Sequence, residues 1–253
     1  MADDGIGRNN ARSGGFRSCA ATHQGTANRL NEDSYVNRPD LGIWAVADGA
    51  GGHESGEVAS AEVAQALQGV DPGLSAAEML LEVRTRLETA HAHLNAEAAR
   101  HRVGAVMATT VVVVLVRDDH FACLWAGDSR AYLLRGRALT RISRDHSLVQ
   151  ALIETGEITE AEAAHHPKAN VITRAVGAGP EQLELEKRTG QLQVGDRLLL
   201  CTDGLSKTLP EELLAELLSG DDDAAAERLV TAALMAKVTD NVTAVTIDFG
   251  TGG

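Results

Sequence analysis

The sequence contains several short apolar runs, each bounded by glycines or by charged residues. We expect these runs to be β-strands, because β-branched and aromatic residues are frequent in them and each is too short for a typical helix. They cover residues 16–22, 43–47, 111–116, 121–125, 131–134, 138–142, 197–201 and 242–249. Short turns join several neighbours, for example Arg117-Asp118-Asp119, and such connections predict antiparallel pairing.

Other stretches show the spacing of amphipathic helices. The longest runs from Ser75 to His101, where apolar residues recur every three or four positions, at Leu80, Val83, Leu87, Ala90, Leu94 and Ala98. Further helices are expected after Ser55, between Pro210 and Gly220, and from Asp221 or Asp222 to Met235. Because helices precede and follow the strands, we predict an α+β fold in which helices cover antiparallel sheets. We interpret His91, His93 and His101 as surface side chains of the long helix.

The segment from about residue 145 to residue 180 differs from the rest of the chain. It contains a short helix over Leu148–Thr155 and a second one that starts at Thr159, with a Thr-x-x-Glu capping box to Glu162. Neither helix has a strong apolar face. We therefore predict a surface flap that contributes to substrate access more than to the core.

Length and composition indicate one globular domain. The 253 residues contain no linker-like stretch, so we assign residues 1–15 to a flexible tail, 16–249 to a single domain and 250–253 to a short C-terminal tail. The N-terminus lacks a signal-peptide pattern, and the longest apolar block, Val111–Val116, is far shorter than the about 20 residues that cross a bilayer. A cytoplasmic protein without membrane contact is expected.

Charge and cysteine content argue against a nucleic-acid-binding protein and against a protein with disulfides or a zinc site. The formal charge of −13 argues against a surface that binds nucleic acid. The three cysteines, Cys19, Cys123 and Cys201, are odd in number and widely spaced, and the last two lie in apolar runs. Buried free thiols in a reducing compartment are therefore favoured over disulfides or a zinc site.

Aspartates stand at the ends of four predicted strands. They are Asp48 after 43–47, Asp128 after 121–125, Asp203 after 197–201 and Asp240 before 242–249. One such motif alone is more typical of a turn, but recurrence at strand ends suggests convergence on one edge. Because unpaired carboxylates repel each other and resist burial, convergence implies bound cations. Gly49 lacks a Cβ atom, so its backbone can approach a ligand and turn its carbonyl toward it.

Together with the neighbouring residues, these aspartates form a set of motifs that recurs in one family. The set comprises Asn31-Glu32-Asp33-Ser34, AVADGAGGH (45–53), Gly127-Asp128-Ser129-Arg130, DHSLVQALIETGEIT (145–159), NVITRAVG (170–177), LLLCTDGLS (198–206) and Asp240-Asn241. In this order they resemble the bacterial branch of the PP2C-type (PPM family) metal-dependent serine/threonine protein phosphatases. The resemblance runs from about Phe16 to Phe249.

The resemblance implies a four-layer αββα sandwich of two antiparallel β-sheets flanked by helices, with a two-metal site at one end and a small flap. Hard oxygen ligands of the implied kind favour Mn²⁺ or Mg²⁺ over zinc. The implied metal ligands are Glu32, Asp48, Gly49 through its carbonyl, Asp128, Asp203 and Asp240.

The resemblance also assigns a role to each carboxylate. Asp48 would bridge both metals. Asp203 and Asp240 would hold one metal, and Glu32 would reach the other directly or through water. Asp128, together with Asp203, would bind a third ion.

The implied reaction is hydrolysis of phosphoserine and phosphothreonine in proteins, opposing a cognate serine/threonine kinase. A metal-bridging hydroxide would attack phosphorus while the cations neutralise charge on the phosphoryl oxygens. The implied partners are phosphorylated proteins and the kinase, without nucleic acid or membrane. Consistently, the chain has neither a Cys-x5-Arg phosphate loop nor a P-loop.

The chain departs from the family pattern at two positions. A phosphate-binding arginine usually precedes the glutamate of the Asn-Glu-Asp motif by four positions, where this chain has Asn28. Arg29, one position later, is the candidate for that role, and Arg29 and Asp48 are the predicted catalytic residues. Ala50 stands where eukaryotic relatives carry a histidine proposed as general acid, and His53 is not assigned that role. Protonation of the leaving group stays unassigned.

Two other functions fit parts of the pattern. The displaced arginine also fits a catalytically weak or inactive signalling module that keeps the fold and binds a partner, although the retained aspartates argue against it. A metal-dependent hydrolase of small phosphate esters is the third hypothesis. Comparing phosphopeptides with nucleotides and sugar phosphates as substrates separates it from the first.

Overall fold

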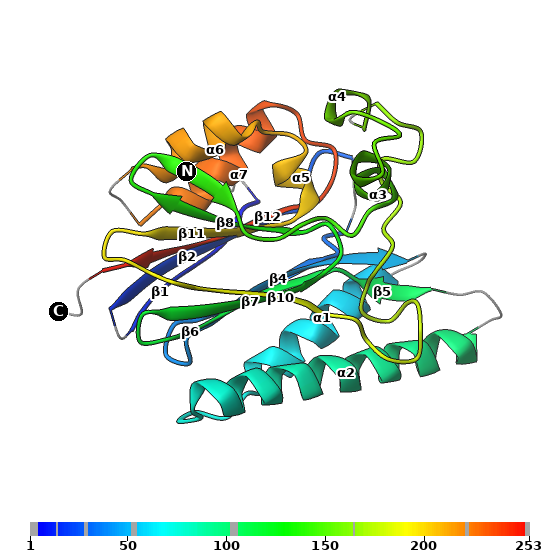
Figure 1. Cartoon of the computed structure of the whole chain (residues 1–253), viewed down its shortest axis with the longest axis horizontal. Coiled ribbons are helices and arrows are strands. Elements are labelled where there is room, and N and C mark those ends of the chain that lie inside the picture. The colour runs from blue at the N-terminus through cyan, green and yellow to red at the C-terminus, as the bar shows by residue number, and fades with distance from the viewer. Residues whose placement is uncertain are drawn as a thin grey trace.

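The computed structural model describes residues 5–13, 15–27, 30–51, 55–101, 106–163, 165–220 and 223–250. Within these ranges the chain forms two stacked β-sheets with helices on both outer faces (Figure 1). This is the predicted four-layer α+β sandwich. No helix in the described ranges has the length and apolar character needed to span a membrane.

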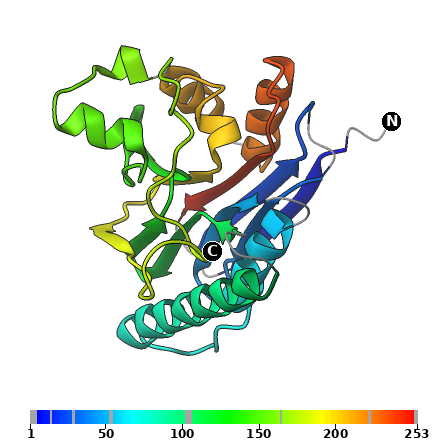
Figure 2. The same cartoon turned by 90° about the vertical axis from the view of Figure 1, so that its right-hand side faces the viewer.

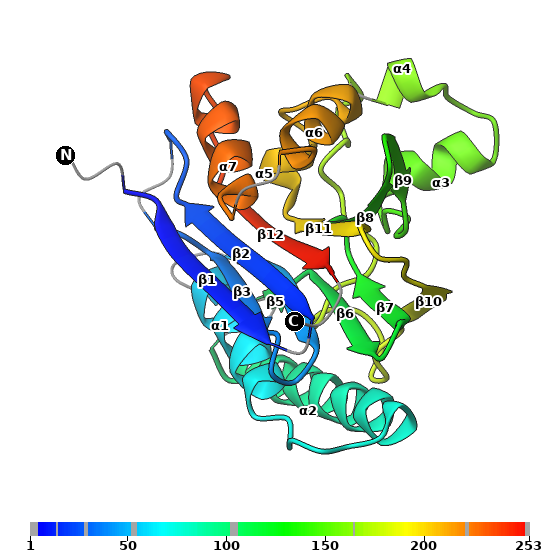
Figure 3. The same cartoon turned by 90° about the vertical axis from the view of Figure 1, so that its left-hand side faces the viewer.

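Both sheets are antiparallel throughout. The first has the strand order β1 (Gly7–Ser13), β2 (Phe16–His23), β12 (Val242–Phe249), β11 (Arg197–Cys201), β8 (Arg130–Arg135) and β9 (Ala138–Arg141), as Figure 3 shows. The second has the order β10 (Glu186–Gln191), β7 (His120–Ala126), β6 (Val111–Arg117), β4 (Ile43–Gly51) and β3 (Asp33–Arg38), with β5 (Met107–Thr109) paired to β4.

The helices form the outer layers and the flap. Two long helices, α1 (Ser55–Gln68) and α2 (Ala76–His101), cover the second sheet. The first sheet is covered by α5 (Asp203–Ser206), α6 (Glu211–Leu218) and α7 (Ala225–Met235). The flap carries α3 (Leu148–Glu154) and α4 (Glu160–Ala163), which lie apart from both sheets in Figure 2.

The central strands are apolar without interruption because both of their faces are buried. On β6, Val111, Val113 and Leu115 pack against the helices. The alternate residues of the same strand, Val112, Val114 and Val116, pack between the two sheets. Such a central strand therefore has no polar face, and its sequence is a continuous apolar run.

The predicted N-terminal tail over residues 1–15 is wrong for residues 7–13. This segment is the edge strand β1, which pairs with β2 from Gly7 opposite Thr22 to Ser13 opposite Phe16. Its side chains are mostly exposed, and Arg8 forms an ion pair with Glu227 of α7. An edge strand held by backbone hydrogen bonds and ion pairs has no apolar signal, so composition could not reveal it. Residues 1–4 and 251–253 of the predicted tails lie outside the described ranges.

The segment predicted as a flap contains the two short helices α3 and α4. The capping box is present, since Glu162 Oε2 accepts from Thr159 N at 2.8 Å and Thr159 Oγ1 accepts from Glu162 N at 3.3 Å.

The prediction that His91 lies on the surface is wrong. Its ring is buried, and Nδ1 accepts a hydrogen bond from Gly177 N at 3.0 Å, so it joins α2 to the end of the flap.

Trp44 is one of the large side chains packed in the layer between the two sheets. Its side chain is fully buried, and its ring meets that of Phe16 edge-on at a centroid distance of 5.2 Å. We expect Trp44→Ala to lower the free energy of unfolding by about 3–5 kcal/mol, because it leaves a large cavity. Trp44→Phe keeps an aromatic ring and should cost less. Urea denaturation measures both values, and an Ala variant within about 1 kcal/mol of the wild type would contradict this view of the core.

Candidate active site

Acidic side chains from distant parts of the sequence meet at one end of the sandwich. Asp33 begins β3 and pairs directly with Asp48 on β4. The connection from β7 to β8 brings Asp128, and Asp203 follows β11 as the first residue of α5. Strand register and strand ends thus place these carboxylates together, and the charge of Asp240, which precedes β12, also acts on Asp48. The sequence predicted this convergence for the four aspartates Asp48, Asp128, Asp203 and Asp240.

The backbone around Asp48 is fixed on both sides. Asp48 N donates to Thr110 Oγ1 at 3.0 Å, and Asp48 O accepts from Thr110 N at 2.8 Å. Gly49 N donates to Glu32 O at 3.1 Å, and a Cβ atom at Gly49 would lie 2.1 Å from Gly56 O. Only glycine therefore allows strand β4, the Glu32 loop and helix α1 to approach this closely.

A buried asparagine holds the loop that carries Glu32. Asn241 Oδ1 accepts a hydrogen bond from Glu32 N at 2.8 Å. Its Nδ2 donates to Gln24 O at 2.9 Å and to Leu30 O at 3.0 Å. Because Asn241 follows Asp240 directly, it sets the position of the Glu32 loop relative to Asp240.

Asp128 and Asp203 share a basic side chain. The Lys207 ammonium donates to Asp203 Oδ2 at 2.6 Å and to Asp128 Oδ2 at 3.1 Å. It also donates to Asn170 Oδ1 of the flap at 3.1 Å. Burial alone would lower the pKa of Lys207, but the charges of Asp203 and Asp128 raise it above its ordinary value.

The clustering of carboxylates changes their affinity for protons. Burial raises the pKa of Asp48 well above its usual value, and the charges of Asp33, Asp203, Asp128 and Asp240 raise it further. Burial also raises the pKa of Asp33, to about 7. The ionised cluster is thus unfavourable by itself, and a positive charge bound among these groups would stabilise it.

The edges of the cluster show the same effect. Burial raises the pKa of Glu32, and the charges of Asp240 and Glu57 add to that rise. Burial followed by the charge of Asp203 raises the pKa of Asp128, while Lys207 acts in the opposite direction.

These residues fit divalent cations that prefer oxygen ligands. Asp33 Oδ1 and Asp128 Oδ1 are buried and have no hydrogen-bond partner within the described ranges. No group of three or more His, Cys, Asp or Glu side chains in those ranges is arranged so that these side chains alone could hold a metal ion. Backbone carbonyls and water would therefore supply the remaining ligands, as is usual for Mg²⁺ and compatible with Mn²⁺.

Not every predicted site residue can be placed, and two residues of the cluster were not predicted. Arg29 lies outside the described ranges, as do Asn28 and His53. Asp33 was missed as a site residue because acids in a loop are usually solvated. Its signal was the position beside Glu32 at the start of a strand. Lys207 was also missed, although it stands four residues after Asp203 within one helical turn.

A polar cavity of about 660 Å³ lies between the flap and the acid cluster. The acid cluster is the group of mutually repelling carboxylates Glu32, Asp33, Asp48, Asp128, Asp203 and Asp240. Its wall on the core side includes Asp128 and Lys207, and its wall on the flap side includes Gln150 and Asn170. The flap begins at this cavity with Asp145, which forms an ion pair with Arg130 at 2.7 Å. The cavity therefore has the position expected for a substrate that approaches the carboxylates.

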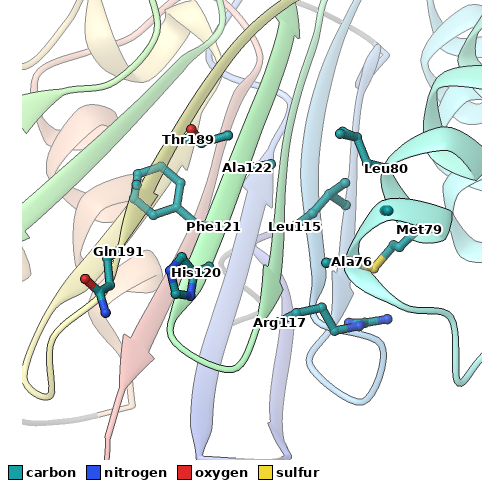
Figure 4. A pocket seen from close by; sticks show the side chains of 12 residues that line it. Ala76, Met79, Leu80, Leu115, Arg117, His120, Phe121, Ala122, Thr189 and Gln191 are labelled. Carbon is teal, nitrogen blue, oxygen red and sulfur yellow. The ribbon is translucent and has the colours of Figure 1, made fainter.

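A second hollow, of about 510 Å³, has a different character. It lies between the start of α2 and the strands β6, β7 and β10, and Figure 4 shows it lined by apolar side chains such as Met79, Leu115 and Phe121. Its strand residues are at the Arg117–His120 turn, opposite the strand ends that carry the acids. No carboxylate of the described residues lines it, so it is separate from the acid cluster.

The carboxylate pKa values predict how stability depends on pH in the absence of metal. A carboxyl whose pKa rises on folding stabilises the native state when protonated, and this stabilisation is lost as the pH rises through about 7, the value for Asp33. We expect the melting temperature in EDTA to fall between about pH 5 and about pH 8, and to fall less in Asp33→Asn. Added Mn²⁺ should remove most of the fall. A melting temperature in EDTA that is constant or rises over this range would contradict the electrostatic description.

Comparison with known proteins agrees with this geometry. Residues 21–240 match the family described as Protein phosphatase 2C. The serine/threonine protein phosphatase PstP of Mycobacterium tuberculosis is 35% identical over 234 residues, which are 92% of this chain and 45% of PstP. The chain thus spans about half the length of that relative.

Solved structures of similar proteins share the whole fold. PppA, a key regulatory component of the T6SS in Pseudomonas aeruginosa, superposes with a TM-score of 0.86 at 39% identity, covering 92% of this chain and 97% of PppA. The catalytic domain of PstP in complex with two manganese ions superposes with a TM-score of 0.81 at 34% identity, covering 92% and 97% of the two chains. By the family match over 21–240 and these similarities, the chain belongs to the protein phosphatase 2C family.

Proposed function

We propose that this chain is a Mn²⁺- or Mg²⁺-dependent protein phosphatase that hydrolyses phosphoserine and phosphothreonine in proteins. The observation that carries the proposal is the convergence of carboxylates from β3, β4, the β7–β8 connection and α5 at one end of the sandwich. Family membership supports it, and so does the relative that was solved with two manganese ions. The proposed domain is 7–249, which extends the predicted boundary by strand β1.

The proposed ligands of two cations are Glu32, Asp48, the Gly49 carbonyl, Asp203 and Asp240, with Asp33 beside them. When bound, the two cations would supply an activated water and neutralise charge on the phosphoryl group. Thr110 fixes the backbone of Asp48, and Asn241 holds Glu32 in place. These contacts pre-organise the carboxylates, which limits the reorganisation needed during the reaction.

The proposed substrate reaches the cluster through the cavity beside the flap. A phosphorylated side chain of a protein would extend toward the carboxylates, and the residues next to it in the peptide would lie along Gln150, Asn170 and Lys207. Arg29 is the proposed phosphate-binding arginine, as predicted from the sequence. A cognate serine/threonine kinase that supplies the phosphorylated protein is part of this proposal.

Activity should depend on Asp48 and on the metal. Asp48→Asn should lower the rate of phosphothreonine-peptide hydrolysis with Mn²⁺ by more than about a hundredfold, because changing groups that only orient a metal ligand already costs about 10- to 100-fold. Folding should be retained, since the substitution removes a repelling charge. Initial rates are measured with Mn²⁺, Mg²⁺ or EDTA.

The matched control for this experiment is Asp118→Asn. Asp118 is exposed in the turn after β6, where its φ of 53° is one that asparagine also adopts readily. The control should hydrolyse the peptide at the wild-type rate. If the wild-type protein hydrolyses no phosphopeptide with any of the metals, the hypothesis of an inactive signalling module that binds a partner would be favoured. Faster hydrolysis of nucleotides or sugar phosphates than of phosphopeptides would favour a small-ester hydrolase.

The role of Asn241 can be tested separately. Asn241→Ala removes three hydrogen bonds that position the Glu32 loop, so we expect the Mn²⁺ concentration for half-maximal activity to rise by about 10- to 100-fold. Amide hydrogen exchange over residues 24–32 should become faster. Asn10→Ala, at an exposed position of β1, is the control. Unchanged metal dependence in Asn241→Ala would show that this side chain does not position Glu32.

A further inference from the structure

The Lys207 side chain is surrounded by oxygen atoms of three separate segments. Its ammonium group carries three N–H donors, and the structure gives it three acceptors, on Asp203, Asp128 and Asn170. These belong to the start of α5, the β7–β8 connection and the flap. The hydrogen-bonding capacity of the ammonium is therefore fully used at this one position.

Local structure explains how the lysine reaches this position. Lys207 N donates to Asp203 O at 2.8 Å, so one helical turn of α5 places the lysine on the same side as Asp203. The Asp128 side chain is only 3% exposed, and its Oδ1 has no hydrogen-bond partner within the described ranges. Lysine thus supplies the positive charge that a buried carboxylate next to Asp203 requires.

We propose that Lys207 is a built-in cation, which takes the place between Asp128 and Asp203 that a further divalent ion would occupy and ties flap residue Asn170 to it. The third ion expected from the sequence would then have no room and no unbalanced charge at this position. The inference rests on the proposed function for the two neighbouring cations. It assigns to Lys207 a positioning role that the sequence motifs did not indicate.

Lys207, which neutralises part of the carboxylate charge, also lines the proposed substrate cavity. Asp128, Asn170 and Lys207 all line the cavity of about 660 Å³. A metal ion in place of the ammonium would be bound by Asp128 and Asp203 without the long lysine side chain, and the contact with Asn170 would be lost. The ammonium group of Lys207 therefore links Asn170 of the flap to Asp128 and Asp203, and this positive charge is part of the protein chain.

The number of Mn²⁺ ions bound per chain tests this inference directly. Native mass spectrometry and equilibrium dialysis would compare the wild type with Lys207→Gln, Lys207→Arg and the exposed control Lys187→Gln. We expect Lys207→Gln to bind one more Mn²⁺ per chain than the wild type, because two carboxylates lose their cation. Lys207→Arg and Lys187→Gln should bind the wild-type number. In the Lys207→Gln background, Asp128→Asn should remove the additional ion.

Two results would overturn different statements. Equal Mn²⁺ numbers in the wild type and Lys207→Gln, with all variants folded by circular dichroism, would overturn the role of Lys207 and leave the proposed phosphatase intact. A wild-type protein that binds no Mn²⁺ would instead overturn the proposed function.

Hydrogen exchange in the flap provides a second measurement that does not depend on activity. Without Mn²⁺, both Lys207→Gln and Asn170→Ala should speed amide exchange around residues 168–174, because each removes the contact between Lys207 and the flap. Only Lys207→Gln should change the number of bound ions. Unchanged exchange in both variants would show that Lys207 does not fasten the flap.

Discussion

Mutual repulsion among buried carboxylates is the constraint on which this structure depends. Asp33 and Asp48 stand directly opposite each other in the pairing of β3 and β4, and the charges of Asp128, Asp203 and Asp240 act on Asp48 as well. Burying like charges this close together costs free energy unless the groups are protonated or a cation lies between them. Burial at one end of a well-packed sandwich therefore makes this group of charges unfavourable unless cations bind there, as the proposed function requires.

The rest of the molecule holds this unfavourable cluster in place. Apolar residues bury both faces of the central strands, and that packing provides the stabilisation that the acidic end lacks. Close backbone approach at Gly49 and the hydrogen bonds of Asn241 then restrict where Asp48 and Glu32 can lie. Rigid sheets thus carry the carboxylates, while the flap, which has little core of its own, borders the cavity through which substrate would approach.

The acid cluster contains one basic side chain, that of Lys207. Within the described ranges Asp128 and Asp203 meet a lysine ammonium. In the proposed function, the remaining carboxylates bind ions taken from solution. Because the lysine is part of the chain, its charge is present at every metal concentration. The flap contact through Asn170 follows from the length of the lysine side chain.

The layered fold and most carboxylates of the site could be predicted from residue types and their spacing along the chain. Apolar runs such as Val111–Val116 predict strands, and aspartates at strand ends predict the convergence of Asp48, Asp128, Asp203 and Asp240. Motif order predicted the family. These features are visible because they depend on residue type and short spacing.

The remaining features depend on contacts between segments that lie far apart in the chain. The polar strand β1 exists through backbone pairing with β2, which leaves no apolar pattern in the sequence. His91 is buried because the flap folds over it, and Lys207 meets Asp128 although 79 positions separate them in the chain. Contacts of this kind depend on which segments the fold brings together, and neither composition nor local periodicity encodes that information.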